Sequence, residues 1–382
     1  MGSSYTHRHQ YFQEANSHRL SKQKMNTRII QHCFGKPASG GPIVALERLL
    51  AHSSVPYGVI RQTEPAGGLN VALIRRFVRE LRQQQPQLVH VRGLGNEGFH
   101  AALAARLAGV PKILVSVHGT QRDLRHPGNP LRHWVVKSIL EPLTLVMATH
   151  VATVCEFAAQ RSFIRPFIGK LVGVVPNGVE LPNLSRPEEP DFRARWGIPA
   201  DLPLAVCVSR ITEEKGYLTL ASALRILDAE CRLALLVVGG GDESKHIRNQ
   251  FSGLANIVVR FVGHQHDVGS FLAASDLFLF PSLHENLSNA LIEAMAHGLP
   301  AIATDVGGNT EVVARGGGIL VPPGNAIELA TAIARLLREP DFCMELAQQA
   351  RENIRAHYSV ERMVSDWQGL YERILKDDHG RA

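Results

Sequence analysis

The sequence predicts an α/β protein in which two Rossmann-like domains, each with a parallel β-sheet, face a cleft. Its 382 residues are more than twice the ~150 residues of an average domain. Short runs of Val, Ile and Leu alternate with helical patterns along most of the chain, which is typical of βαβ units. A proline-rich stretch near the middle interrupts the alternation. We therefore expect one parallel sheet before this stretch and another after it.

Short runs of three to six mostly apolar residues are the candidate strands of both sheets. Residues 70–84 between two of them are predicted to be a helix, because Leu73, Phe77 and Leu81 recur at helical spacing. The expected strands are Arg28–Gln31, Tyr57–Arg61, Leu88–Val91, Ile113–Val117, His150–Val154 and Leu171–Val175 in the first half, and Leu204–Val208, Leu233–Val238, Ile257–Phe261, Leu277–Phe280, Pro300–Thr304 and Ile319–Val321 in the second.

The proline-rich stretch is the predicted linker between the domains. Four prolines fall between Pro182 and Pro199, where neither helical nor strand periodicity is present. At the far end, residues 359–376 have a helical pattern, and we expect this helix to cross back onto the first domain. The predicted divisions are a flexible extension (1–26), a first domain (27–182), a linker (183–203), a second domain (204–358) and a return helix with a tail (359–382).

Composition excludes several classes of protein. Apolar residues make up 45% and charged residues 20%, as in globular proteins rather than disordered ones. No run approaches the ~20 apolar residues of a membrane-spanning helix, and residues 1–24 lack the apolar core of a secretory signal. The five cysteines are widely spaced, which favours free thiols in a reducing compartment. We expect a cytoplasmic protein.

Charge is unevenly divided between the two halves. Residues 1–190 hold 23 Lys and Arg against 11 Asp and Glu, a net charge of +12, whereas residues 191–382 have a net charge of −6. The basic half could face an anionic surface, and the acidic half argues against a nucleic-acid partner.

One short motif suggests a dinucleotide-binding dehydrogenase. Gly93, Gly95 and Gly98 have the G-x-G-x-x-G spacing, follow an expected strand and precede an Ala-rich helix. The motif does not follow the first strand, however, and no Asp or Glu ends the next strand at Val117-His118-Gly119. These glycines are better explained by close approach of the backbone to a cleft.

The second half contains a candidate anion site. Arg210 follows an expected strand, and Lys215 comes five residues later before an expected helix, so both cations lie where open α/β sheets bind ligands. Glu285 and Glu293 are eight residues apart, ~12 Å along a continuous helix, which is too far for the acid pair of a glycosidase. They are better placed to contact two parts of one long ligand, beside amides near Asn286 and Leu287.

Five segments together resemble retaining glycosyltransferases of family 4, which have the GT-B fold. The resemblance extends from about Thr27 to Tyr371. In chain order, the segments are Gly40-Gly41, Pro176-Asn177-Gly178-Val179, Arg210 to Gly216, Glu285 to Glu293, and Thr304-Asp305-Val306-Gly307-Gly308. This chain departs from many members after the first glutamate, where Asn286-Leu287-Ser288-Asn289 replace the usual Gly and Pro neighbours. The identity of the donor sugar is therefore left open.

The resemblance implies a nucleotide-diphosphate sugar as donor in the second domain and an acceptor in the first. Arg210 and Lys215 would bind the diphosphate, Glu285 and the amides of Asn286 and Leu287 the sugar, and Glu293 the ribose. Val262-Gly263 would line the base, Gly40-Gly41 would close over the phosphates, and His118 would lie by the anomeric carbon. Asn177-Gly178 is expected to shape a turn at the cleft.

The same resemblance implies retention of the anomeric configuration. The chain has no Asp-x-Asp motif, the usual metal-binding device of the other major transferase fold, so no metal or cofactor is expected. Cationic side chains and amides would then neutralise the leaving diphosphate. A nucleotide-sugar epimerase of the same fold is the alternative, and a catalytically silent binding subunit is a third possibility.

The predicted helix at 70–84 carries arginines that could contact an anionic membrane. Arg75, Arg76, Arg79 and Arg82 lie on its polar side, and near an anionic leaflet each would contribute ~1 kcal/mol. We expect either a solvated helix face or peripheral docking on the inner face of the plasma membrane, with a glycan or lipid-linked acceptor and a UDP-sugar donor.

Overall fold

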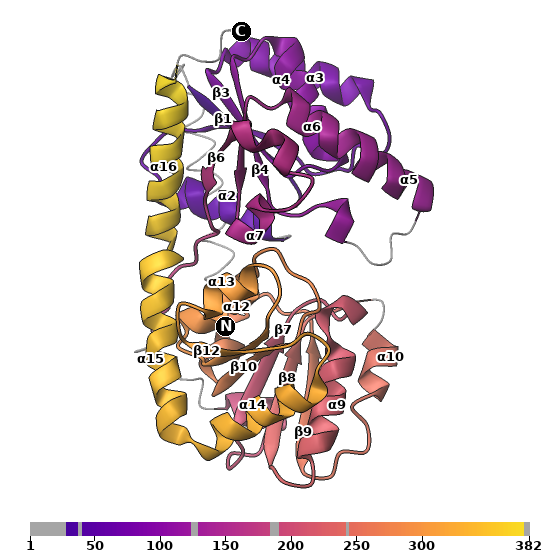
Figure 1. Ribbon diagram of the computed structural model, residues 1–382, viewed down its shortest axis with the longest axis vertical. Helices are drawn as coiled ribbons and strands as arrows, with labels where there is room; N and C mark the ends of the chain where they lie inside the picture. Colours follow the sequence, from indigo (N-terminus) through magenta and orange to yellow (C-terminus); the bar gives the residue numbers. More distant parts are fainter. Residues whose placement is uncertain (1–27, 37–39, 124–128, 184–190, 242–243, 378–382) are drawn as a thin grey trace.

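The computed structural model describes residues 28–36, 40–123, 129–183, 191–241 and 244–377. These residues form two α/β domains, each around a six-stranded parallel sheet (Figure 1). The strand order is β2-β1-β3-β4-β5-β6 in the first sheet and β12-β11-β10-β7-β8-β9 in the second. The predicted fold class is confirmed.

All twelve predicted strands are present, each within three residues of its expected bounds. Most of their residues are buried on both faces, which explains why the strands read as continuous apolar runs. The strands are β1 (Ile29–Phe34), β2 (Gly58–Gln62), β3 (Leu88–Arg92), β4 (Lys112–Val117), β5 (His150–Thr153), β6 (Leu171–Val174), β7 (Leu204–Val208), β8 (Leu233–Val238), β9 (Ile257–Gly263), β10 (Leu277–Phe280), β11 (Ala301–Thr304) and β12 (Gly318–Val321).

Helices cover both faces of the first sheet. One face packs against α3 (Val71–Gln84), α4 (Asn96–Ala108) and α6 (Glu141–Met147), and the other against α2 (Gly41–His52) and α16 (Val360–Lys376). Asn70 caps α3, and its side chain accepts a hydrogen bond from the Leu73 amide at 2.9 Å. The shorter elements are η1 (Gln121–Asp123), α5 (Pro130–Val135), η2 (Val136–Leu140), α7 (Glu156–Ala159) and η3 (Arg165–Lys170).

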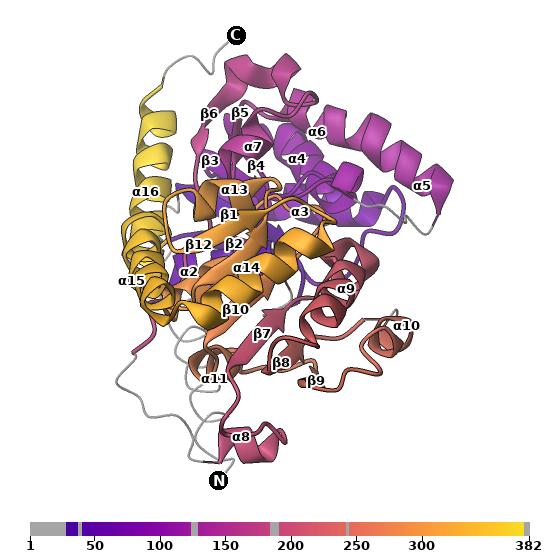
Figure 2. The same cartoon turned by 60° about the horizontal axis from the view of Figure 1, so that its bottom comes forward.

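The second sheet is covered in the same way. On one face α9 (Tyr217–Leu227) and α14 (Ala326–Arg338) lie side by side (Figures 1 and 2). The other face packs against α11 (Gly269–Ala273), α12 (Asn289–Ala296) and α15 (Pro340–His357). The remaining elements are α8 (Phe192–Arg195), η4 (Glu213–Lys215), α10 (Ser244–Asn249) and α13 (Gly308–Val313).

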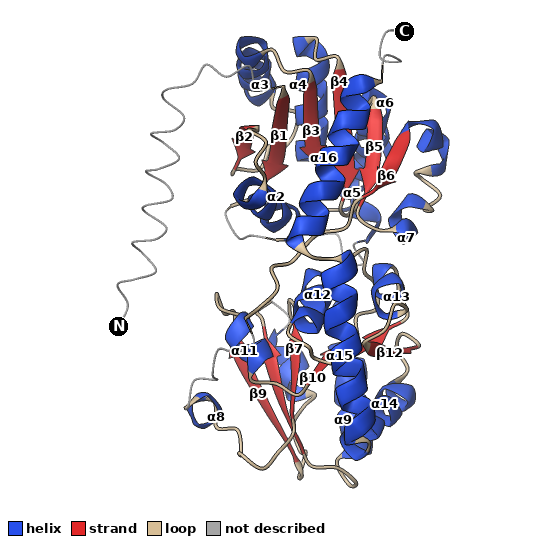
Figure 3. Ribbon diagram, turned by 90° about the vertical axis from the view of Figure 1, so that its left-hand side faces the viewer, coloured by secondary structure: helices blue, strands red, loops and turns tan. Residues whose placement is uncertain are grey.

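The C-terminal helices connect the two domains. Figure 3 shows α15 along the second domain and α16 along the first. Trp367, Leu370 and Tyr371 of α16 are buried in the core of the first domain. At the crossing, a Cβ on Gly178 would lie 2.7 Å from the Ser359 carbonyl oxygen, so only glycine fits where the two segments meet. The Asn177-Gly178 turn therefore supports the return of the chain.

The predicted linker does not extend to residue 203. Phe192, Ile198 and Leu202 are buried in the same core as β7, so the described residues from 191 onward pack as part of the second domain. The predicted extension, residues 1–26, lies outside the described residues. None of the described helices is both long and apolar enough to cross a membrane.

Candidate functional site

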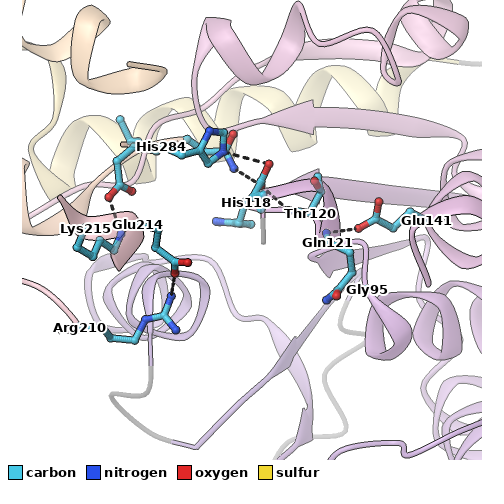
Figure 4. A pocket seen from close by; sticks show the side chains of 14 residues that line it. Gly95, His118, Thr120, Gln121, Glu141, Arg210, Glu214, Lys215 and His284 are labelled. Carbon is cyan, nitrogen blue, oxygen red and sulfur yellow. Dashed lines mark hydrogen bonds and ion pairs between the residues drawn. The ribbon is translucent and has the colours of Figure 1, made fainter. Parts of the chain in front are cut away.

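A cavity of about 340 Å³ lies between the two domains (Figure 4). Six predicted site residues line it: His118, Arg210, Lys215, Glu285, Asn286 and Leu287. Side chains of the second domain, such as Lys215 and Arg210, face those of the first, such as His118 and Glu141. The carboxyl ends of the strands in both sheets thus meet at one cavity.

Lys215 and Glu285 form the centre of the second-domain wall. Lys215 Nζ lies 2.5 Å from Glu285 Oε1, and both side chains are mostly buried. Ser282 Oγ donates to the same carboxylate oxygen at 2.9 Å. Gly216 has a φ of 74°, and a Cβ there would lie 1.8 Å from the Pro281 carbonyl oxygen. Glycine therefore allows η4 to lie directly against the loop after β10, which brings Lys215 to Glu285.

Arg210 is the exposed cation of this wall. Its side chain is 69% exposed, and its only ion pair among the described residues is with Glu214, at 3.4 Å. An exposed pair of this length is weak, so the guanidinium can turn to an anionic ligand at little cost. Arg210 and Lys215 then offer two cations to one anion in the cavity.

Asn286 and Leu287 precede helix α12 instead of beginning it. The helix starts at Asn289, with Ser288 as its cap, three residues later than the sequence suggested. Among the described residues, no protein acceptor takes a hydrogen bond from the Asn286 or Leu287 amide. These two amides can therefore donate to a ligand, but without the dipole of a helix start.

On the first-domain side, His118 follows β4 and ends a chain of buried hydrogen bonds. Its Nε2 lies 3.1 Å from Ser116 Oγ, which lies 2.8 Å from His90 Nε2, and His90 Nδ1 lies 2.8 Å from Tyr371 Oη. Gln31 donates to Tyr371 Oη at 3.0 Å. Helix α16 therefore reaches the cavity wall through this chain.

The direction of these bonds decides which nitrogen of His118 carries the proton. The Tyr371 hydroxyl, which accepts from Gln31, can donate its proton to His90 Nδ1. His90 then donates from Nε2 to Ser116, and Ser116 donates to His118 Nε2. Burial, aided by the charge of Arg92, lowers the pKa of His118 to about 3, so the ring is neutral at pH 7. In this arrangement the His118 proton lies on Nδ1, which has no partner among the described residues.

Sequence reasoning missed Asp123, which joins the two domains beside the cavity. Its carboxylate lies 3.1 Å from His284 Nε2, accepts from Asn286 Nδ2 at 2.8 Å and pairs with Arg161. Burial alone would raise the pKa of Asp123, but His284 and Arg161 outweigh it and hold the pKa well below its usual range. The signal was available, because residues 118–123 follow the carboxyl end of a predicted strand.

Glu141 is a second missed carboxylate in the cavity wall. Its side chain is fully buried, pairs with Arg122 and accepts from the Gln121 amide at 2.7 Å. Burial raises the pKa of Glu141 above its usual value. Both missed carboxylates of the first domain thus have fixed partners.

Five predicted residues lie outside the cavity: Gly40, Gly41, Val262, Gly263 and Glu293. Glu293 Oε1 accepts from Arg48 Nη2 of the first domain at 2.7 Å. Glu285 lies in the loop between β10 and α12, and Glu293 lies within α12.

The glycines near α2 have different structural roles. Gly40 has a φ of 113°, which favours glycine, with no atom near the position of a Cβ. A Cβ on Gly41 would lie 3.5 Å from Asn289 Nδ2, so α2 begins against the start of α12.

Val262 and Gly263 end β9 at the edge of the second sheet.

The glycine motif at 93–98 serves packing. A Cβ on Gly98 would lie 2.1 Å from the Gly93 carbonyl oxygen, so glycine lets α4 begin close to β3. Gly95 lines the cavity, as expected for backbone near a cleft.

Comparisons with known proteins agree with this geometry. Residues 17–182 match the family described as Glycosyltransferase Family 4, and residues 203–339 match that described as Glycosyl transferases group 1. The chain is 27% identical to TuaC of Bacillus subtilis, a glycosyltransferase assigned to teichuronic acid biosynthesis, over 85% of this chain and 79% of the relative.

Two further proteins are similar over most of their length. One is the Escherichia coli UDP-Gal:α-D-GlcNAc-diphosphoundecaprenol α-1,3-galactosyltransferase, 23% identical over 79% of this chain and 81% of the relative. The other is Anabaena HepE, solved in complex with UDP, which superimposes with a TM-score of 0.71 at 22% identity over 91% of this chain and all of HepE. Both halves of the chain and their arrangement lead to the same conclusion: this protein is a glycosyltransferase of family 4 with the GT-B fold.

Proposed function

We propose that this enzyme transfers a sugar, with retention and without a metal ion, from a nucleotide-diphosphate sugar to a hydroxyl of a glycan or lipid-linked acceptor. The donor we favour is a UDP-sugar, and the process is synthesis of a bacterial cell-surface polysaccharide or glycolipid. The observation that carries the proposal is the cavity wall in which Arg210, Lys215 and Glu285 face His118 of the other domain.

The charges of the second-domain wall suit an activated sugar. A pyrophosphate between Arg210 and Lys215 would meet two cations, and the Asn286 and Leu287 amides could donate beside it. Once Lys215 contacts phosphate, Glu285 can accept hydrogen bonds from sugar hydroxyls. HepE was solved with UDP, and the E. coli relative is named for a UDP-sugar, which supports UDP as the carrier.

In the proposed reaction the acceptor hydroxyl attacks the anomeric carbon on the face that the diphosphate leaves. The bond from carbon to the diphosphate oxygen breaks, and that oxygen takes the acceptor proton. Arg210 and Lys215 stabilise the negative charge of the leaving group. His118, neutral and with its proton on Nδ1, would donate a hydrogen bond to a sugar oxygen near the reacting carbon.

The net charges of the two halves of the chain indicate where each substrate would bind. The first domain, which is basic, would hold the acceptor, and the galactosyltransferase relative is named for an acceptor carried on diphosphoundecaprenol. We propose that the enzyme works in the cytoplasm, at the inner face of the plasma membrane.

A panel of UDP-, GDP- and ADP-sugars tests the donor. Binding at 100 times Kd adds ~2.7 kcal/mol of stability, which raises the melting temperature measurably. We expect the largest shift with a UDP-sugar, in buffer containing EDTA. NMR of the product formed from an α-linked donor should show an α-linkage. A β-linked product would contradict retention, and activity abolished by EDTA would contradict metal independence.

The epimerase alternative gains no support from the relatives described above. It requires an acid or base in the cavity, and two of the carboxylates there, Asp123 and Glu141, are held by Arg161 and Arg122. A UDP-sugar incubated without acceptor separates the two functions, since only an epimerase would convert the sugar.

A further inference from the structure

Helices α5, η2 and α6 form one helical segment, 130–147, that carries an apolar side toward solvent. Leu131 is 71% exposed and Trp134 is 56% exposed. Ile139, Leu143 and Val146 are also exposed. The spacing from residue 134 to residue 139 is five, and the π-helical turn of η2 keeps such a spacing on one side of the helix. Large apolar side chains gathered in this way mark an interaction site.

Cations lie near this apolar side. Arg132 belongs to the segment, whose single carboxylate, Glu141, is fully buried. Helix α4 packs between α6 and α3 (Figure 1), so α3 belongs to the same layer of helices. A groove of about 630 Å³ there has apolar side chains, including Leu107, beside the guanidinium groups of Arg75, Arg79 and Arg82.

We propose that this outer face binds a lipid bilayer that contains anionic phospholipids. The outer face is defined by Leu131, Trp134, Ile139, Leu143 and Val146, with Arg75, Arg79 and Arg82. Trp and aliphatic side chains on one side of a helix insert at the level of the headgroups, while flanking cations attract anionic lipid. A second copy of this chain is a poorer occupant, because it would bring the same cations together.

The outer face adjoins the cavity through a shared helical segment. Glu141, on the buried side of segment 130–147, lines the cavity and holds the Gln121 amide and Arg122. A bilayer bound to the exposed side would therefore hold a lipid-linked acceptor within one helix diameter, ~10 Å, of the cavity wall. This part of the inference rests on the proposed function.

Vesicle co-sedimentation of the full chain tests the inference. Vesicles of equal parts phosphatidylglycerol and phosphatidylcholine should bind the wild type, and vesicles of phosphatidylcholine alone should bind it weakly. The double variant Leu131→Glu/Trp134→Glu should reduce the partition coefficient by about tenfold or more. Ile327→Glu/Met344→Glu is the matched control, since both residues are similarly exposed, at 66% and 63%, in the second domain.

A second measurement reports on Trp134 directly. Of the three tryptophans, Trp134 is the exposed one, so its emission should shift to the blue when anionic vesicles are added. Trp134→Phe should abolish the shift and keep the binding.

Three results would overturn the inference: equal partition of the wild type and the Leu131→Glu/Trp134→Glu variant, no preference for anionic vesicles, or a dimer in analytical ultracentrifugation that the double variant dissociates. Turnover of donor with a soluble acceptor, measured without vesicles, separates this inference from the proposed function. Lost vesicle binding with intact turnover would refute the outer face alone. Vesicle binding without turnover of any donor would refute the proposed function.

Discussion

The two walls of the cavity are built in different ways. On the second-domain wall, Arg210, Lys215 and Glu285 are held by neighbours from adjacent loops, and one of them is largely exposed. On the first-domain wall, His118 is held by a buried chain that ends at Tyr371, more than 250 residues away in sequence. The contrast suggests a wall of cations that adjust to a phosphate opposite a wall that keeps one neutral ring in one orientation.

The largest expected effect is the loss of a cation from the adjustable wall. Lys215→Ala should lower kcat by ~10²–10³, because a preorganised partner of the developing charge is removed. Arg232→Ala is the control, an exposed arginine of the second domain that pairs with Asp201. Steady-state kinetics would measure the loss of kcat. A melting temperature of Lys215→Ala equal to that of the wild type would show that the loss does not come from unfolding. A rate within twofold of the wild type would refute the role of Lys215 in stabilising the leaving group.

The buried histidines should make the first domain sensitive to acid. Burial lowers the pKa of His32 to about 4 and that of His118 to about 3, and it lowers the pKa of His90 as well. In the unfolded chain each has a pKa near 6.5, so below that pH the unfolded state binds more protons and the folded state loses stability. His32 and His118 should each cost roughly 1 kcal/mol at pH 5.5.

Urea unfolding between pH 7.5 and 5 would measure this loss. His32→Gln should reduce the dependence on pH, since it removes one of these histidines away from the cavity. An unfolding free energy that stays constant over this range would contradict the neutral, buried state of these rings.

Tyr371→Phe should break the chain that orients His118. Without the phenol, His90 and then Ser116 lose their fixed direction of donation, so His118 is no longer held in the Nδ1–H form. We expect kcat to fall by about tenfold with little change in the donor KM, as for one lost hydrogen bond. Tyr57→Phe is the control, because Tyr57 packs on Tyr371 but lies outside the chain.

The ¹⁵N chemical shifts of His118 would distinguish orientation from stability. A mixture of tautomers in Tyr371→Phe and a single Nδ1–H form in the wild type are expected. A single, unchanged tautomer in both proteins would show that the chain does not direct His118.

The smallest expected effect concerns Glu293 and Arg48, which join the two domains outside the cavity. If Glu293 holds the ribose, Glu293→Ala should raise the donor KM about fivefold with a smaller change in kcat. Arg48→Ala frees the carboxylate and should lower the donor KM or leave it unchanged. Equal increases in KM for both variants would mean that the pair only holds the domains together.

The sequence predicted most of what is local and little of what is distant. All twelve strands follow from apolar runs, and Arg210, Lys215 and Glu285 were found because they follow strands within short segments. The chain from His118 to Tyr371 and the pair of Arg48 with Glu293 join residues more than 200 positions apart, which no spacing in one sequence can indicate. The start of α12 was placed too early because Asn286-Leu287 read as its first turn, whereas Ser288 is the cap.

Calorimetric titration of UDP in the presence of EDTA tests the central claim most directly, since it asks whether Arg210 and Lys215 alone can hold a pyrophosphate. We expect the wild type to bind, Arg232→Ala to bind equally, and Arg210→Ala/Lys215→Ala to bind about a hundredfold more weakly, because two charged hydrogen bonds are lost. Equal affinity in the double variant, or wild-type binding that requires a divalent metal, would contradict the account.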